Sequence, residues 1–187
     1  MPADLDFRAG AAAVLRADPS WPQQFERVAQ ELRDVLGRAC TALDHVGGSS
    51  VAGLPSRPVI DVLAITPHLT GFDNRSALLR ALGYGVFRGI AVDSARAFYR
   101  APRASCCAVS LIVTEPGDRE AVGRLLVRDL LRSHPAEAAA FGTLKQRLAR
   151  EHDGDETAYQ NAKSQALRSL LDRARGRRSV RTRPVLS

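Results

Sequence analysis

The feature that most constrains this chain is a strongly apolar run, residues 58–65 (PVIDVLAI), that contains a single acid, Asp61. Apolar runs of this length, bounded by turn residues, are typical of a buried strand. A carboxylate among such neighbours costs free energy unless a metal ion or a basic group is its partner. Arg57, just before the run, is one such group. Asp61 is therefore the first candidate for a functional residue.

A glycine-rich turn precedes this strand. A shorter candidate strand, residues 40–46, ends in Gly47-Gly48-Ser49-Ser50, and twelve residues (49–60) separate the glycine pair from Asp61. Small residues let the backbone N–H groups approach a phosphate, and a carboxylate that faces such a turn is the arrangement that holds Mg²⁺ against a triphosphate. Either feature alone is structural more often than functional, so the inference depends on their order and separation.

The rest of the pattern predicts an α/β (α+β) fold: a small mixed sheet with flanking helices, followed by a helical C-terminal half. A helix is expected from Ser20, as its cap, to Gly37. Further strands are expected at 87–92, 95–102 and 106–113, a helix at 74–82, and three amphipathic helices at 118–134, 135–152 and 156–175. One domain is predicted over residues 18–172, with the sheet in 18–115 and the helical half in 116–172; residues 1–17 are predicted to be irregular.

The positive charge of the chain is concentrated at its C-terminal end. The net charge is +7, and residues 173–187 carry six arginines and no acid, so the remainder has a charge of +1. This stretch is predicted to be a disordered basic tail. Such a tail can contact nucleic acid through phosphates, but no aromatic residue lies between its arginines to stack on bases. A solvated end is therefore the alternative.

Composition narrows the class of protein. No apolar run reaches the roughly 20 residues that a membrane helix needs, and the first residues lack the pattern of a secretory signal. Three cysteines, two of them adjacent, favour neither a disulfide framework nor a zinc site. The chain is expected to be a cytoplasmic protein without a membrane span.

Three blocks of sequence carry a resemblance to a known family. The run Asp44-His45-Val46-Gly47, with Ser50-Val51, Gly53-Leu54 and residues 58–62 (PVIDV), is similar to the signature of the GrpB family, a group within the nucleotidyltransferase superfamily. Trp21-Pro22 with Phe25 resembles the opening helix of that family. Blocks at 128–135, 141–145 and 159–163 resemble its helical half. The resemblance implies a minimal nucleotidyltransferase sheet, a nucleoside triphosphate as substrate or ligand, and Mg²⁺ bound at Asp61.

Several residues around the turn have candidate roles, and the chain departs from the family pattern in ways that bear on catalysis. Gly47, Gly48, Ser49, Ser50 and Arg57 would bind phosphate, and His45 would act as an acid or base, although a hydrogen-bonded spacer is the alternative. Superfamily enzymes place a second acid two residues after the first, where this chain has Leu63. Members of the family also tend to carry histidines at the positions of Cys107 and Ser110. Their turn usually reads Gly-Ser-Thr-Ser, so Gly48 of this chain lacks a hydroxyl that the family pattern offers to a phosphate.

The helical half supplies further candidates. Arg128 and Arg132 share one helix face at i, i+4 spacing, so they are predicted either to reach the phosphates or the acceptor across a cleft, or to form an exposed ion-pair cluster with Asp129. Lys145 and Lys163 are expected to be solvated.

Three hypotheses follow. The chain transfers a nucleotidyl group from a nucleoside triphosphate to an unknown acceptor with Mg²⁺; or it is a degenerate module that binds a nucleotide or small phosphorylated ligand; or it is a scaffold that acts through its basic tail. Metal dependence separates the first two, because a transferase needs a divalent ion and an anion pocket does not.

Overall fold

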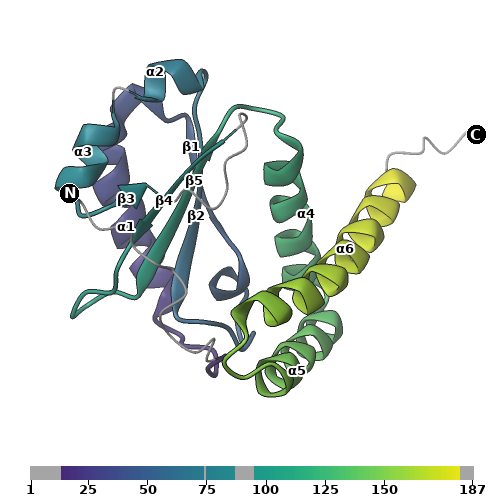
Figure 1. Ribbon diagram of the computed structural model, residues 1–187. Coiled ribbons are helices and arrows are strands. Elements are labelled where there is room, and N and C mark those ends of the chain that lie inside the picture. The colour runs from purple at the N-terminus through teal and green to yellow at the C-terminus, as the bar shows by residue number, and fades with distance from the viewer. Residues whose placement is uncertain (1–13, 74, 87–94, 182–187) are drawn as a thin grey trace, which may run out of the picture.

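The computed structural model describes residues 14–73, 75–86 and 95–181 of the 187. Its centre is a five-stranded mixed sheet in the order β1-β2-β5-β4-β3 (Figure 1). The strands are β1 (Ala42–Val46), β2 (Val59–Ile65), β3 (Gly85–Val86), β4 (Ala95–Arg100) and β5 (Ala108–Thr114). Among the described strands, only β2 and β5 pair in parallel, and the other neighbours are antiparallel. This architecture confirms the predicted α+β fold class.

One face of the sheet packs against the first helices. Helix α1 (Trp21–Leu36), with α2 (Leu69–Asp73) and α3 (Ser76–Ala81), covers this face in Figure 1. Its core contains Phe25 and Leu32 of α1 and alternate residues of β2, namely Ile60, Val62 and Ala64. Because side chains alternate across a strand, the intervening residues Asp61 and Leu63 face the other way. Asp61 therefore points toward the helical half.

The helical half contains α4 (Arg119–Ser133), α5 (Pro135–Glu151) and α6 (Glu156–Arg181). In Figure 1, α4 stands beside the sheet, and α5 and α6 lie farther from the sheet than α4 does. These helices share a core with Val51 and Leu54, which belong to the loop between the glycine-rich turn and β2. The loop is thus held between the two halves of the protein.

Several boundaries differ from prediction. Helix α1 begins and ends as expected, but the Ser20 side chain makes no capping bond to the backbone; its hydroxyl accepts a hydrogen bond from the Gln24 side chain instead. The expected helix at 74–82 is represented by α3, with the additional short helix α2 before it. The strand expected at 87–92 lies outside the described residues.

The basic stretch that was predicted to be a disordered tail from residue 173 is helical up to Arg181, because α6 continues to that residue. Two ion pairs explain the difference: Arg173 Nε lies 3.1 Å and Arg177 Nη1 lies 2.8 Å from the Glu137 carboxylate of α5. Ala174, between them, is buried. This part of the sequence therefore packs against α5. Within the described residues, no helix is long and apolar enough to cross a membrane.

Candidate functional site

Asp61 lies in a row of side chains that crosses the sheet on the face toward the helical half. Its strand partners in register are Val46 on β1 and Ser110 on β5, and Ser110 is in turn paired with Tyr99 on β4. Ser110 stands at one of the positions where the family tends to carry histidine, and its hydroxyl is hydrogen-bonded to Asp61. The row therefore presents one carboxylate among hydroxyl groups.

The glycine-rich turn passes directly over this carboxylate. A Cβ atom placed on Gly47 would lie 2.0 Å from Asp61 Oδ2, and a Cβ atom on Gly48 would lie 2.1 Å from Ser56 Oγ. Gly47 also has a positive φ of 71° with ψ of −168°, a conformation that is essentially restricted to glycine. Both glycines are needed for this close approach of backbone to side chain. The predicted proximity of the turn to Asp61 is present in the structure.

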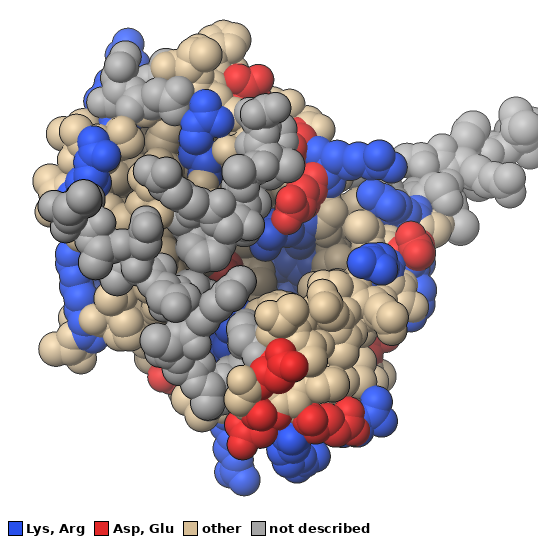
Figure 2. Space-filling model, in the orientation of Figure 1, with Lys and Arg blue, Asp and Glu red and all other residues tan. Residues whose placement is uncertain are grey.

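Four cationic side chains from four different segments lie close enough to Asp61 to interact with it electrostatically. They are Arg57 from the loop before β2, Arg124 from α4, Lys145 from α5 and Lys163 from α6, and with Asp61 they are called here the Asp61 cluster. In Figure 2, Lys and Arg side chains gather in a hollow between the sheet and the helical half. The site is therefore a basic cleft with a carboxylate in it.

The ionisation of Asp61 reflects two opposing effects. Burial raises the pKa of its carboxyl above the ordinary value, while the charges of Arg124, Lys163 and Arg57 and the Ser110 hydrogen bond lower it. Burial is the larger effect, so the net shift of the pKa is upward. The Arg124 Nε atom nearby is itself buried and has no hydrogen-bond partner among the described residues. The Nη2 atom of Arg124 is paired with Glu120 of the same helix, 2.6 Å away.

Lys145 is buried, which contradicts the expectation that it is solvated. It is 5% exposed, and its Nζ donates a 2.8 Å hydrogen bond to Ser56 Oγ, behind Gly48. Nζ also lies 5.2 Å from the centre of the Phe141 ring. Burial lowers the pKa of Lys145 to about 7, with further lowering from Lys163 and Arg57 and an opposing effect of Asp61. No pattern in the sequence around Lys145 distinguishes it from a surface lysine, because its burial depends on how α5 packs.

The hydroxyl groups of the turn already have partners inside the protein. Ser49 Oγ donates to the Val59 carbonyl at 2.7 Å, and Ser50 Oγ donates to the Gly47 carbonyl at 2.7 Å. Both serines are buried. Their hydroxyls therefore stabilise the turn.

His45 lies on the opposite face of the sheet from Asp61. Its ring stacks on Phe25 of α1 with 4.6 Å between ring centres, and its Nε2 is 3.1 Å from Ser49 Oγ. Burial lowers the pKa of His45 to about 4, helped by the charges of Arg132 and Arg128. An imidazole with this pKa stays neutral at physiological pH and is a weak base. The arrangement favours the spacer alternative over an acid–base role next to Asp61.

Arg128 and Arg132 hold α4 against the outer side of the turn. Arg128 Nη1 is 2.8 Å from Asp44 Oδ1, and its Nε is 2.7 Å from Asp129 Oδ1. Arg132 Nε donates to the Ser50 carbonyl at 2.9 Å. The residue of α4 whose charge reaches Asp61 is instead Arg124, one turn earlier. The sequence does contain a signal for Arg124, because it lies four residues before Arg128, at the same i, i+4 spacing that links Arg128 to Arg132.

The residues around Asp61 do not fit a magnesium site held by the protein. Mg²⁺ prefers several oxygen ligands, and the two-ion mechanism needs more than one carboxylate. The position two residues after Asp61 is the buried Leu63, and the described residues contain no group of three or more His, Cys, Asp or Glu side chains that is placed to hold a metal ion. The cationic members of the cluster would repel a divalent ion.

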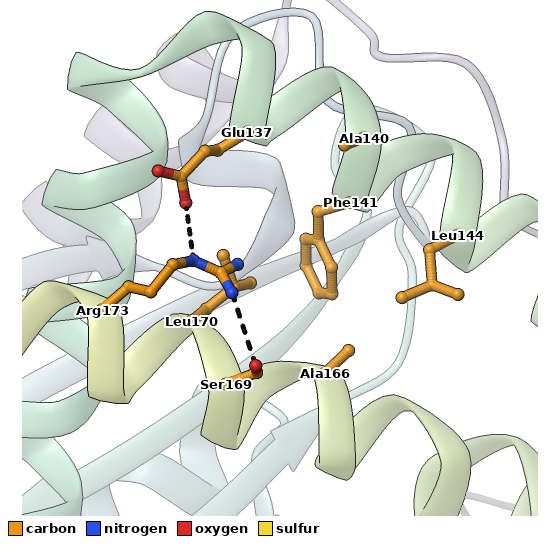
Figure 3. Close-up of a pocket in the computed structure, with 8 residues that line it drawn as sticks. All are labelled: Glu137, Ala140, Phe141, Leu144, Ala166, Ser169, Leu170 and Arg173. Carbon is orange, nitrogen blue, oxygen red and sulfur yellow. Dashed lines mark hydrogen bonds and ion pairs between the residues drawn. The ribbon is translucent and has the colours of Figure 1, made fainter.

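A separate groove of about 460 Å³ lies between α5 and α6 (Figure 3). Phe141, Leu144 and Leu170 make most of its lining apolar, and the Glu137–Arg173 ion pair lies at one end. Nothing in the structure shows what covers it. Its lining is mostly apolar, unlike that of the basic cleft, and none of the candidate site residues lines it.

Comparison with known sequences gives consistent matches. A family model described as GrpB protein matches residues 11–173. A UPF0157 protein of Pseudomonas aeruginosa is 32% identical over 165 residues, which cover 86% of this chain and 66% of that protein. A dephospho-CoA kinase of Mycobacterium tuberculosis is 33% identical over 86 residues, which cover 44% of this chain and 21% of the kinase. This chain thus matches only part of these relatives' lengths.

A solved structure supports the same assignment. The crystal structure of a conserved protein GrpB from Enterococcus faecalis superposes with a TM-score of 0.78 at 27% sequence identity, over 87% of this chain and 96% of that one. The sheet, the helical half and the family match over most of the sequence agree, and the chain therefore belongs to the GrpB family.

Proposed function

We propose that the protein binds a ligand that carries phosphate groups, with nucleotides as the first candidates, in the cleft at the Asp61 cluster. One observation carries this proposal: four cationic side chains from four segments converge on a single carboxylate beneath a glycine turn. Cations that are gathered in a partly buried site repel one another, and a bound anion relieves that repulsion. Phosphate groups supply the needed charge and several acceptor oxygens.

Nucleotidyl transfer is the second candidate. The position of Asp61 directly under the turn favours it, since the resemblance to the nucleotidyltransferase superfamily implies an acid at this place. The cluster does not fit Mg²⁺ held by the protein, so the structure gives no route for a metal-assisted step. The match to part of a dephospho-CoA kinase adds dephospho-CoA and coenzyme A to the nucleotides worth testing as ligands.

Asp61→Asn separates the two candidates in a calorimetric titration with adenosine triphosphate, with and without Mg²⁺. If the cleft binds the anion directly, removing the Asp61 charge relieves repulsion, and affinity without metal is expected to rise by about threefold to tenfold. If Asp61 holds a metal ion against the phosphates, the same change lowers affinity, and only in the presence of Mg²⁺. Dephospho-CoA, coenzyme A and inorganic phosphate complete the set of ligands.

Lys163→Gln supplies the positive test of the cleft. Loss of one cation at the cluster is expected to weaken binding by about tenfold, the usual effect of one charge-assisted contact. The matched control is Arg168→Gln, which removes an exposed cation from the same helix outside the cluster. Equal losses in the two variants would show that the ligand responds to the overall charge of α6, and would contradict the assignment to the cleft.

A further inference from the structure

Lys145 is an unusual member of the cluster because its ammonium group is almost fully enclosed. Lys145 is 5% exposed, and its Nζ makes one hydrogen bond, to Ser56, among the residues that the structure describes. An ammonium group has three N–H donors, so two remain for another partner. Nζ lies directly behind the turn, 3.0 Å from where a Cβ atom of Gly48 would be. The group therefore lies at the wall of the cleft with unused donors.

The charged groups that act on Lys145 come from three segments, namely α6, the loop before β2, and β2. Lys163 on α6 and Arg57 before β2 disfavour its charged form, and Asp61 on β2 favours it. Burial is the largest cause of the lowered pKa of Lys145, and the two cations add to it. Burial and two like charges thus disfavour the ammonium form of Lys145, while one carboxylate favours it. The pKa of that carboxyl group is itself raised by burial. Lys145 consequently sits near its point of half-protonation in neutral solution, and a new charge in the cleft shifts the balance.

We propose that Lys145 takes up a proton when phosphate groups enter the cleft, so that the site favours multiply charged phosphate ligands over singly charged anions. This inference rests on the proposed function and adds to it the residue whose protonation responds to the charge of the ligand. A ligand with two or more negative charges offsets Lys163 and Arg57 and stabilises the ammonium form. A monocarboxylate offsets too little of the surrounding charge to do so.

The expected pH dependence follows from the direction of this change. The empty protein has a Lys145 pKa of about 7, and the bound anion raises it. Between these two values, binding consumes a proton, so affinity falls as pH rises, by up to about tenfold per pH unit. At pH 8 the terminal phosphate of adenosine triphosphate is already ionised, since its pKa is about 6, and the ligand does not contribute to the uptake.

The experiment is calorimetric titration of the protein with adenosine triphosphate at pH 8, in two buffers of different ionisation enthalpy. The difference in heat gives the number of protons taken up, which is expected to exceed about half a proton per ligand. Lys145→Arg keeps a permanent charge and is expected to bind without proton uptake. Lys145→Met is expected to bind at least about tenfold more weakly, also without uptake. Asp61→Asn excludes the other titrating group, and uptake is expected to persist in it.

The outcomes separate this inference from the function on which it rests. Binding with proton uptake that disappears in Lys145→Arg supports both. Binding that takes up no proton, or uptake that is lost in Asp61→Asn and kept in Lys145→Arg, overturns the role of Lys145 and leaves the phosphate site intact. An absence of binding by adenosine triphosphate, dephospho-CoA and inorganic phosphate overturns both proposals.

Discussion

Replacing Gly47 with alanine is expected to lower the free energy of unfolding by about 3 kcal/mol or more. Two effects add at this position. The backbone has a φ of 71° and ψ of −168°, which a residue with a Cβ atom adopts only with strain. The added methyl group would also lie 2.0 Å from Asp61 Oδ2, so the carboxylate or the turn must move.

Gly53→Ala is the matched control for the backbone effect. Gly53 also has a positive φ, 74°, but a Cβ atom there meets nothing within 4 Å, and the expected cost is about 1 kcal/mol. Urea unfolding of both variants measures the difference. In a double-mutant cycle with Asp61→Ala, the cost of Gly47→Ala should shrink, because the clashing oxygen is gone. Equal costs at Gly47 and Gly53, without coupling to Asp61, would contradict the close approach of turn and carboxylate.

Replacing Lys145 with methionine is expected to stabilise the protein at pH 7 by about 3 kcal/mol. Folding lowers the pKa of Lys145 from 10.5 to about 7, so the folded protein binds the proton less tightly than the unfolded chain does. The wild type therefore loses stability as pH falls from 10.5 toward 7, by about 1.4 kcal/mol per pH unit. Methionine removes this cost and gives up the hydrogen bond to Ser56, which offsets about 1 kcal/mol.

The sign of this effect is checked by its pH dependence. The advantage of Lys145→Met should be largest at pH 7 and should disappear near pH 10. At pH 10 the folded-state lysine is neutral and the pH lies close to the unfolded-state pKa of 10.5, so the remaining cost of about 1 kcal/mol is balanced by the hydrogen bond that methionine gives up. Denaturant unfolding at pH 7, 8.5 and 10 measures it. A methionine variant that is less stable than the wild type at all three values would show that Lys145 is a structural group. The predicted combination, higher stability with weaker ligand binding, is typical of a residue that is retained for function.

The fold was largely predictable because its elements carry strong local signals. The apolar run at β2, the start and end of α1 and the break between α4 and α5 at His134-Pro135 are all visible in the sequence. The extent of α6 was not, because its arginines looked like a solvated tail. Its last turns are stabilised by contacts of Arg173 and Arg177 with Glu137 on another helix, which no local pattern reveals.

The candidate site was predictable only where its parts are close in sequence. The glycine turn, Arg57 and Asp61 fall within fifteen residues, 47–61, and were assigned together. Lys145 and Lys163 reach Asp61 through the packing of α5 and α6, so their sequence positions give no hint of it. His45 was misleading for the opposite reason: it is next to the turn in sequence, but strand alternation puts it on the far face of the sheet.

The most direct test of the phosphate site is an NMR titration of the ¹⁵N-labelled protein with adenosine triphosphate, followed at the backbone amides. The amides of Gly47, Gly48 and Asp61 are predicted to shift together with one dissociation constant, while those around the Glu137–Arg173 ion pair between α5 and α6 stay in place. Shifts confined to the arginines of α6, with Gly47 and Gly48 unaffected, would contradict the account and place the contact with phosphate outside the cleft.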